Sequence, residues 1–306
     1  MPPAFMKTTV LIPTYRRPED LKRCLAALQQ QHQPPNEVLV VVRDSDQDTW
    51  AFLNSHSFAP LPVHPQVVTQ PGQVAALNAG LEAATGDIIA ITDDDAAPHP
   101  EWLARLTAHF EADPQVGGVG GRDWMYLCDR LQDATVHPGA SDVVGRVQWF
   151  GKVVGNHHIG QGQPREVDVL KGANMSYRRQ AIGDLRFDAQ LQGKGAQVHN
   201  DLAFSLAIKQ RGWKLIYDPA VAVDHFLAAR FDRDQRTQFD ATACTQASYN
   251  ETLVLLRYFP WLRWPVYITW AVLIGTRKAP GLVQVLRLLP MERDVALKRG
   301  WATLRG

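Results

Sequence analysis

Short β-rich or apolar runs alternate with longer amphipathic stretches through the first 120 residues of the chain. Valine, isoleucine and threonine dominate the short runs, and a proline or a charged residue follows each of them within two positions. This is the pattern of β-strands. Two of the runs are apolar throughout, as expected for strands that are buried on both faces of a parallel sheet. The predicted strands cover residues 8–12, 38–42, 67–69 and 88–91.

The longer stretches between these strands have the residue spacing of helices. Residues 19–31 place Leu21, Leu25 and Leu28 on one face, after a proline that favours a helix start. Further helices are predicted over residues 73–84 and 98–110. This alternation predicts an α/β fold with a mostly parallel, Rossmann-like sheet flanked by helices. Ligands bind such sheets beyond the carboxyl ends of the strands, so the residues that follow each strand are the functional candidates.

Composition and length limit the class of protein. Of the 306 residues, 45% are hydrophobic and 21% are charged, which is ordinary for a soluble globular chain and excludes a disordered or fibrous one. The net charge of +1 differs from the strongly basic balance of nucleic-acid binders, so no nucleic-acid partner is expected. The three cysteines form no CxxC pair, which indicates a reducing compartment and no zinc site.

The sequence also bears on location. The N-terminal residues lack the apolar run and cleavage site of a signal peptide. The apolar, uncharged run Trp264 to Thr276 is 13 residues long, whereas a membrane-spanning helix needs about 20. We therefore expect a cytoplasmic protein without a transmembrane helix.

The C-terminal residues differ from the rest in charge and aromatic content. Residues 251–306 contain nine Lys or Arg and three Asp or Glu, a net charge of +6, so the first 250 residues carry −5. The same segment contains seven aromatic residues. This composition is typical of peripheral contact with an anionic membrane surface. A helical pair that packs on the core, with its basic face in water, is the equally weighted alternative.

Polar residues follow the first, second and fourth predicted strands, and the last of these groups is acidic. The three groups are residues 13–17, residues 43–46 and the triplet Asp93-Asp94-Asp95. Two like charges ~4 Å apart cost roughly 4 kcal/mol at an effective dielectric constant near 20. A divalent cation such as Mg²⁺ or Mn²⁺ would remove this penalty, and such ions often bind together with substrate phosphates. The alternative is a solvated acidic turn that caps the next helix.

Several segments have, in order, the form of the motifs of a known family. Residues 10–17 read Val-Leu-Ile-Pro-Thr-Tyr-Arg-Arg, residues 85–87 read Thr-Gly-Asp before the aspartate triplet, and residues 172–175 read Gly-Ala-Asn-Met. Together with Asp201, this set resembles family 2 glycosyltransferases over about residues 7–226. The resemblance implies a GT-A fold, a nucleotide-diphosphate sugar donor, a divalent cation (Mg²⁺ or Mn²⁺) and inverting transfer of the sugar.

The resemblance also implies roles for the acidic residues and one histidine. Asp95 matches a metal ligand of the family's DxD motif, and Asp93 a second ligand or a contact to ribose or a metal-bound water, while Asp94 could substitute for either. His225 would be a third ligand or a donor to the diphosphate. Asp201 matches the catalytic base that takes the acceptor proton. For His225 the alternative is a hydrogen-bonded histidine at a strand end. For Asp201 it is a helix N-cap, which is compatible with catalysis.

Donor and acceptor contacts are expected from the neighbouring segments. Asp44 is the candidate for reading the nucleobase. Asn78 would contact the donor or order the acidic loop, and the alternative is an asparagine with no role beyond the interior of its helix. For Tyr15, ordinary packing at a strand end is the alternative. The remaining donor-side candidates are Pro13, Thr14, Tyr15, Arg16, Asp93 and Asp94. The acceptor-side candidates are Gly172, Ala173, Asn174 and Asn200.

The chain departs from the family pattern in three places. Arg43 stands where the first of two acids is usual, which leaves Asp44 alone, and Asn200 stands where a glutamate usually precedes the catalytic aspartate. The Gln-x-x-Arg-Trp signature of processive synthases is absent, since residues 260–264 match only its last two positions. An enzyme that adds a single sugar is therefore expected.

The resemblance and the composition together predict three parts. Residues 1–120 would form the nucleotide-sugar-binding half and residues 121–245 the acceptor-binding and catalytic half of one GT-A domain. Residues 246–306 would form a basic, aromatic, helical C-terminal extension. Within the second half, the glycine-rich residues 123–165 are expected to form an insertion that shapes the acceptor pocket.

The expected function is an inverting glycosyltransferase that adds one sugar to a glycan or lipid-linked acceptor at the cytoplasmic face of a membrane, with Asp201 as general base. Two alternatives stay open. A nucleotidyltransferase would release pyrophosphate, and a non-catalytic nucleotide-sugar binding module would bind the donor without turnover. A dehydrogenase is not expected because no GxGxxG motif follows a predicted strand.

Overall fold

The computed structural model describes residues 6–127, 130–132, 142–228, 231 and 238–306. Parts of the predicted insertion 123–165 therefore lie outside the described residues. The elements in chain order are β1 (Thr8–Thr14), α1 (Pro18–Gln29), β2 (Glu37–Arg43), α2 (Gln47–Ser55), β3 (Val63–Val68), α3 (Gln73–Ala83), β4 (Ile88–Ile91), β5 (Ala96–Pro98), α4 (Trp102–Ala112), β6 (Val116–Leu127), β7 (Arg130–Leu131), β8 (Arg146–Val147), β9 (Val153–Val154), β10 (Arg165–Val167), β11 (Met175–Arg178), α5 (Arg179–Ile182), α6 (Asn200–Gln210), β12 (Lys214–Phe226), α7 (Ala241–Tyr258), the 3₁₀ helix η1 (Trp261–Arg263), α8 (Trp264–Leu273), α9 (Leu282–Glu292) and α10 (Asp294–Arg305).

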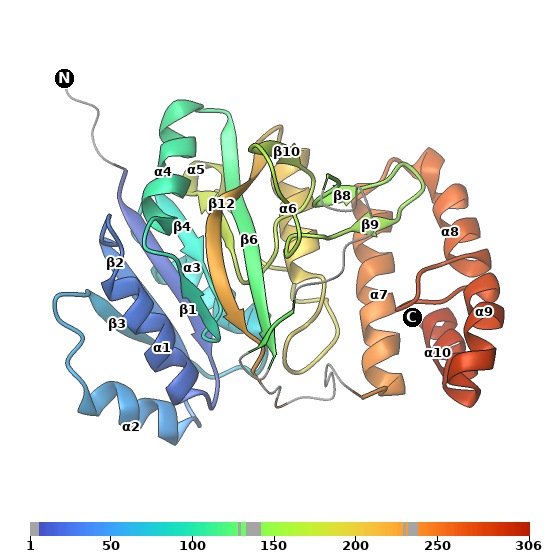
Figure 1. Cartoon of the computed structure of the whole chain (residues 1–306), viewed down its shortest axis with the longest axis horizontal. Coiled ribbons are helices and arrows are strands. Elements are labelled where there is room, and N and C mark those ends of the chain that lie inside the picture. Colours follow the sequence, from blue (N-terminus) through green and yellow to red (C-terminus); the bar gives the residue numbers. More distant parts are fainter. Residues whose placement is uncertain (1–5, 128–129, 133–141, 229–230, 232–237) are drawn as a thin grey trace.

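A large sheet crosses the middle of the molecule (Figure 1). Among the described residues it has ten strands, in the order β10-β12-β6-β11-β4-β1-β2-β3, with β5 beside β12 and β7 beside β6. The pairs β1–β2, β1–β4, β2–β3 and β6–β12 are parallel, while β11 lies antiparallel between β4 and β6. The predicted α/β fold, with a mostly parallel sheet flanked by helices, is confirmed.

Different helices cover the two faces of the sheet. Successive side chains of a strand point to opposite faces, so Val10 and Ile12 of β1 pack with Leu21 of α1 and Trp102 of α4. Leu11, between them, belongs to the core under α3, α5 and α6. Both faces are covered, so residues 38–42 of β2 and all of β4 are apolar, which is why these two strands could be recognised from the sequence.

Most predicted elements of the first 120 residues agree with the observed ones to within a few residues, but α2, β5 and the start of β6 were not predicted, and the bounds of β3 differ. Strand β3 covers Val63–Val68 and not residues 67–69. Its side chains are exposed or half-buried, because it forms the edge of the sheet, so it lacks the continuous apolar run of a central strand. Helix α2 was not predicted, since it buries only Thr49 and Leu53 and its apolar periodicity is weak.

The glycine-rich start of β6 was also not recognised as a strand. Residues 117, 118, 120 and 121 are glycines, and they pass close to neighbouring backbone and side chains. A Cβ atom at Gly121 would lie 1.7 Å from the carbonyl oxygen of Val221. The glycines therefore allow β6 and β12 to approach closely where the register between them shifts.

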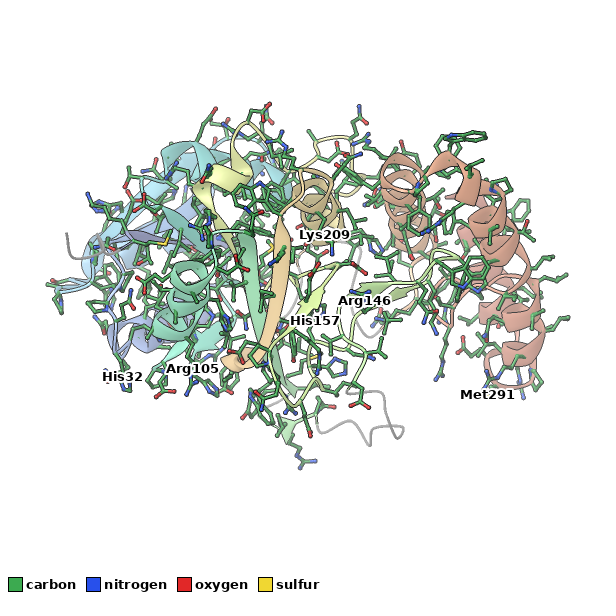
Figure 2. The ribbon with its side chains drawn as sticks, turned by 90° about the horizontal axis from the view of Figure 1, so that it is seen from above. His32, Arg105, Arg146, His157, Lys209 and Met291 are labelled. Atoms are coloured by element: carbon green, nitrogen blue, oxygen red, sulfur yellow. The ribbon has the colours of Figure 1, made fainter. Side chains whose placement is uncertain are left out.

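The C-terminal extension is helical, as predicted. Helix α7 is fixed to the loop before α6 by Asn250, a buried residue whose amide group hydrogen-bonds to the backbone of Gln192 and Val198. Helices α8, α9 and α10 lie beyond α7 (Figure 1), and Met291 is at the end of the molecule opposite His32 and Arg105 (Figure 2). Within the described part of the chain, no helix is both long enough and apolar enough to cross a bilayer.

Candidate functional site

A pocket of 310 Å³ opens beyond the carboxyl ends of β1, β3 and β4. Parallel strands end at the same edge of a sheet, so segments that are far apart in the sequence meet there. Of the predicted donor-side residues, Pro13, Thr14, Tyr15 and the aspartate triplet line this pocket. The complete lining is residues 13–15, 17, 43, 68, 70–73, 76, 93–95, 194–196 and 231.

The middle aspartate of the triplet is held by two residues of the first strand end. Asp94 accepts hydrogen bonds from Thr14 Oγ1 (2.8 Å) and Arg17 Nη1 (2.9 Å), and the same Arg17 nitrogen lies 3.6 Å from Asp95. Burial raises the pKa of Asp94 to about 7, against the opposing effect of Arg17. Burial also disfavours ionised Asp95, but His225 and Arg17 outweigh it and hold the pKa of Asp95 well below its usual value. Arg17, to which the sequence analysis assigned no function, thus offsets part of the repulsion within the triplet.

Asp93, Asp95 and His225 come together as a group that could hold a metal ion. Their potential ligand atoms all lie within 4.8 Å of one another, and His225 Nε2 is 3.2 Å from Asp95 Oδ1. Neither ring nitrogen of the buried His225 has a hydrogen-bond partner among the described residues. Two carboxylates and an imidazole are suitable ligands for a divalent cation such as Mn²⁺ or Mg²⁺. The residues therefore fit the divalent metal that the sequence predicted.

Asp201 lies in the first turn of α6, beside the predicted acceptor segment. Its Oδ2 accepts a hydrogen bond from the backbone N–H of Gly172 (3.4 Å), and its Oδ1 accepts one from the N–H of Leu202 (2.8 Å). The adjoining Ala173 carbonyl accepts a hydrogen bond from Thr92 Oγ1 (2.9 Å), directly before the aspartate triplet. Asp201 and the triplet are thus connected through the short segment 172–173.

A second connection between the two carboxylate groups runs through Gln73. The Nε2 of Gln73 donates to Asp93 Oδ1 (3.3 Å), and its Oε1 accepts from Asn200 Nδ2 (3.4 Å). The backbone N–H of Gln73 donates to the carbonyl of Gly195 (2.9 Å), and the N–H of Val74 donates to the side chain of Gln197 (3.0 Å). The loop before α6 therefore caps the N-terminus of α3. Gln73 could not be recognised as a site residue from the sequence, because only the fold brings it between Asp93 and Asn200.

Two of the predicted donor-side residues, Arg16 and Asp44, are not among the residues that line the pocket, and their donor contacts stay predictions. Arg16 has a left-handed backbone (φ 57°), and its N–H donates to the buried carboxylate of Asp46 (2.6 Å). Asp44 is exposed and is ion-paired with Arg43 (3.2 Å). It is Arg43 and not Asp44 that lines the pocket, and the nucleobase contact of Asp44 stays a prediction.

Two predicted asparagines are used within the protein itself. The Asn78 side chain makes both of its hydrogen bonds to the backbone of Phe187 (2.8 and 3.0 Å). The buried Asn174 side chain accepts from Trp102 Nε1 (2.9 Å) and donates to the carbonyl of Val221 (2.8 Å). The structure thus places both amides in supporting positions outside the pocket lining, and their substrate contacts stay predictions.

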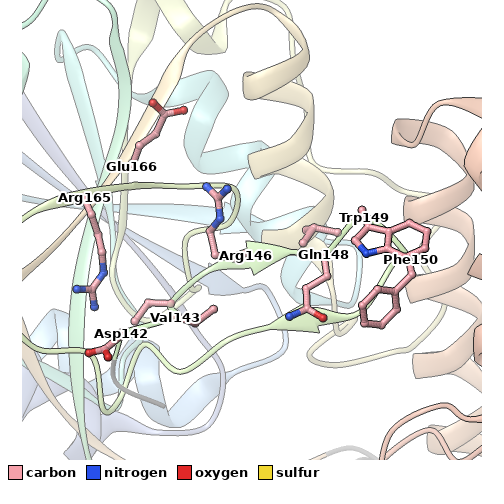
Figure 3. A pocket seen from close by; sticks show the side chains of 10 residues that line it. Asp142, Val143, Arg146, Gln148, Trp149, Phe150, Arg165 and Glu166 are labelled. Carbon is pink, nitrogen blue, oxygen red and sulfur yellow. The ribbon is translucent and has the colours of Figure 1, made fainter. Parts of the chain in front are cut away.

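The insertion borders a second hollow. It measures 610 Å³ and is lined by residues 142–144 and 146–150 with Arg165 and Glu166 (Figure 3). Arg165 pairs with Tyr217 in the first half of β12, whereas His225 is near the end of that strand. This hollow is therefore separate from the pocket that the triplet lines.

The pocket also has a basic side. Arg17, Arg43 and Lys194 are among the residues that line it. Cationic side chains beside a carboxylate-rich metal site are suited to an anionic ligand such as a diphosphate, whose charge both the metal and the side chains would balance.

Comparison with known proteins agrees with this geometry. Residues 9–185 match the model of a family described as glycosyl transferase family 2. Over 245 residues the chain is 25% identical to the glucosyl-dolichyl phosphate glucuronosyltransferase of Haloferax volcanii, with 77% of this chain and 72% of that protein covered.

Solved structures show the same fold. A mannosyltransferase from Pyrobaculum calidifontis in complex with GDP-Man and Mn²⁺ superposes with a TM-score of 0.58 at 20% identity, covering 99% of this chain and 85% of that one. S. aureus TarS residues 1–349 in complex with UDP-GlcNAc superpose with a TM-score of 0.59 at 14% identity, covering 96% and 79%. The fold is thus that of GT-A glycosyltransferases, as the resemblance implied.

Proposed function

The chain belongs to glycosyl transferase family 2 and is a glycosyltransferase, and from this premise we propose that it is an inverting enzyme with Asp201 as its base. It would move one sugar from a nucleotide-diphosphate sugar to a hydroxyl group of a glycan or lipid-linked acceptor. The observation that carries the proposal is the position of Asp201. It is joined to the Asp93–Asp95–His225 group through Gly172 on one side and through Asn200 and Gln73 on the other.

The donor side follows from the charges of the pocket. A divalent cation held by Asp93, Asp95 and His225 would neutralise charge that develops on the departing diphosphate. Arg17 pairs with Asp94 and Asp95, and in this proposal it helps to hold the triplet in place. Tyr15 and Arg43 line the pocket, and in this proposal they bind the nucleoside.

The acceptor side requires a proton acceptor. In an inverting displacement the acceptor oxygen bonds to the anomeric carbon while the bond from that carbon to the diphosphate oxygen breaks. The bonding electrons leave with the diphosphate, and the hydroxyl proton passes to an Asp201 carboxylate oxygen. The Gly172 N–H holds Oδ2, and the start of a helix fixes the side chain, so the base is in place before the acceptor arrives.

Asp201→Asn tests the proposed base, because the amide keeps the shape of the side chain but does not accept the proton. We expect kcat to fall about 10²–10⁴-fold, with the dissociation constant of the donor unchanged. Release of nucleoside diphosphate measures turnover, and calorimetry measures donor binding.

The matched control is Asp113→Asn, which removes an exposed carboxylate that pairs with Lys214 away from the pocket. This control should turn over at the wild-type rate. Full activity of Asp201→Asn would rule out Asp201 as the base. Release of pyrophosphate by the wild type would support a nucleotidyltransferase, and donor binding without turnover would support a binding module.

We further propose that the acceptor is lipid-linked and is met at the cytoplasmic face of a membrane. The name of the Haloferax volcanii relative includes a dolichyl phosphate, which supports a lipid phosphate as part of the acceptor. The second support is the surface of the C-terminal helices. Fifteen of the 22 exposed large hydrophobic side chains among the described residues belong to this surface, which we call the apolar helical surface. Its members are Trp261, Leu262, Trp264, Val266, Ile268, Val272, Leu273, Ile274, Leu282, Val283, Leu286, Met291, Leu297, Trp301 and Leu304.

The positive charge of the C-terminal residues favours an anionic bilayer as the partner of the apolar helical surface. Residues 251–306 have a net charge of +6, and tryptophan, which prefers membrane interfaces, occurs four times among them. Helix α8 has no charged residue and buries only Tyr267. Exposed apolar area of this extent on a soluble surface is otherwise unfavourable.

The apolar helical surface is continuous with the catalytic half through the β8–β9 hairpin. Figure 3 shows Trp149 and Phe150 at the tip of this hairpin, beside the C-terminal helices. The Phe150 ring is 5.3 Å from that of Trp270 on α8. At the other end of the hairpin, the Val147 N–H donates to Asp168 (3.0 Å), four residues before Gly172. A membrane-bound acceptor would therefore meet the same side of the molecule as the acceptor segment.

A further inference from the structure

A fully buried aspartate lies behind His225, outside the Asp93–Asp95–His225 group. Asp123 of β6 pairs in register with Val223 of β12, and His225 follows two residues later. Because side chains alternate along a strand, Asp123 and His225 point to the same face of the sheet. The Asp123 Oδ2 atom is 4.0 Å from His225 Nδ1.

Asp123 is compensated by a single cation among the described residues. It has no exposed surface, and its Oδ2 is 2.9 Å from Lys171 Nζ. Neither of its carboxylate oxygens has a hydrogen-bond partner in the described part of the chain, so the contact with Lys171 is an ion pair. A buried carboxylate without hydrogen-bond partners is unfavourable, and a role for Oδ2, the oxygen that faces His225, would explain why the residue is an aspartate.

The two nitrogens of His225 face different carboxylates. Nε2 lies 3.2 Å from Asp95, and Nδ1 faces Asp123. An imidazole that offers Nε2 to a metal carries its proton on Nδ1, and that N–H needs an acceptor to fix the tautomer and the ring orientation. Among the ion-pair partners of His225 in the described residues, Asp123 is the carboxylate on the Nδ1 side.

We propose that Asp123 is a positioning residue that orients His225 toward the metal and, through Lys171, ties this histidine to the acceptor segment. The proposal rests on the metal site of the proposed function. Lys171 directly precedes Gly172, whose N–H holds Asp201. The chain Asp95–His225–Asp123–Lys171 therefore leads from the donor side to the segment that holds the base.

The test is Mn²⁺ binding to the full-length protein, followed by electron paramagnetic resonance without donor or acceptor. For Asp123→Ala we expect Mn²⁺ affinity to fall about 10–100-fold, together with a changed spectrum of the bound ion. Asp123→Asn restores an acceptor and should recover part of the affinity. The matched control is Asp218→Ala, which removes another buried aspartate of an Asp–His pair, that with His109. It should lower stability but leave Mn²⁺ affinity unchanged.

A second arm shows whether Asp123 acts through His225. In a His225→Ala background, the change Asp123→Ala should cause no further loss of Mn²⁺ affinity, and an additional full loss would overturn the proposal. If Asp123→Ala does not fold, Asp123→Leu combined with Lys171→Met replaces the whole ion pair by apolar side chains and leaves no unpaired charge. The same loss of affinity is expected of this variant.

The Mn²⁺ measurements distinguish a failure of the metal site from a failure of the positioning role of Asp123. If the wild-type protein does not bind Mn²⁺, the proposed metal site is wrong, and the positioning role of Asp123 is wrong with it. Wild-type protein that binds Mn²⁺, with Asp123→Ala equally tight, would overturn the positioning role alone and leave the proposed base untouched.

Discussion

Buried carboxylates of this chain each have a specific partner. Asp94 is paired with Arg17, Asp123 with Lys171 and Asp218 with His109. Removing one member of such a pair leaves the other buried without compensation, which costs more than the pair itself contributes. Single substitutions at these positions are therefore informative only when the partner is considered too.

Asp218 lies outside the Asp93–Asp95–His225 group, and it allows a test of how stability depends on pH. Its carboxylate accepts hydrogen bonds from His109 Nε2 (2.8 Å) and from the N–H of Ala220 (2.9 Å). Burial opposes ionisation, but these bonds prevail and hold the pKa of Asp218 below its usual value. A carboxylate with a lowered folded-state pKa stabilises the fold at pH values above its unfolded pKa, near 4. This contribution is lost as the pH falls through the folded-state value.

We therefore expect Asp218→Asn to lower the free energy of unfolding by about 1–3 kcal/mol at pH 7. The difference from the wild type should shrink at pH 3, where the wild-type carboxylate is also becoming protonated. Urea denaturation at the two pH values measures both differences. A difference that stays constant between them would contradict this account.

At the scale of elements, the start of α3 and the loop before α6 form one unit. The loop supplies the Gly195 carbonyl and the Gln197 side chain to the first N–H groups of α3, which otherwise lack partners at a helix start. Gly72 precedes the helix with φ 109°. The loop that leads to Asp201 is thereby held against the helix that borders the pocket beyond the strand ends.

Gly72→Ala should disturb this unit in two ways. The backbone is in a region that favours glycine, and a Cβ would lie 2.4 Å from Gln197 Oε1. Gly212→Ala is the matched control, since Gly212 has φ 87° but nothing within 4 Å of an added Cβ. The control should lose about 1 kcal/mol from backbone strain alone.

We expect Gly72→Ala to lose more stability than this control and to bind the donor more weakly. Thermal denaturation and donor calorimetry on both variants provide the comparison. Equal losses of stability with normal donor affinity would mean that Gln197 simply moves aside.

At the scale of the whole molecule, the exposed apolar side chains are concentrated at one end. The sheet and its helices bury the apolar residues of the N-terminal half, whereas α8, α9 and α10 leave theirs in the apolar helical surface. Helix α7 and the β8–β9 hairpin link the apolar helical surface to the part of the molecule that contains the pocket beyond the strand ends. A bilayer would therefore position the pocket as well as hold the protein.

Sedimentation with vesicles tests the membrane proposal. We expect the protein to sediment with vesicles that contain anionic lipid and much less with neutral ones, with binding that weakens as salt is added. Replacing Leu262 and Leu286 together by serine should reduce sedimentation severalfold, while Val67→Ser, an exposed apolar residue of β3, should not. Equal sedimentation of all variants would exclude the apolar helical surface as the contact, and a stable dimer without vesicles would assign it to a second copy.

Much of the fold was predictable because its signals are local. The continuous apolar runs of β2 and β4 follow from burial on both faces, and the spacing of Leu21, Leu25 and Leu28 follows from the period of a helix. Strand β3 and helix α2 were less visible because edge and surface elements bury few side chains. The start of β6 could not be recognised as a strand because its residues are mostly glycines. These glycines allow close approach to β12, a strand about a hundred residues away in the sequence.

The sequence by itself determined that three aspartates follow a buried strand, that the chain has family 2 motifs in order, and that its C-terminal residues are basic and aromatic. The family resemblance implied His225 as a third ligand, and the structure brings it to Asp93 and Asp95. Tertiary structure alone decided that Arg17 and Gln73 support the triplet and that Asp123 lies behind His225. The physical reason is the range of the interactions. Hydrophobic periodicity is set by neighbours along the chain, whereas hydrogen bonds and ion pairs depend on distances of a few ångströms that only the packing of distant segments establishes.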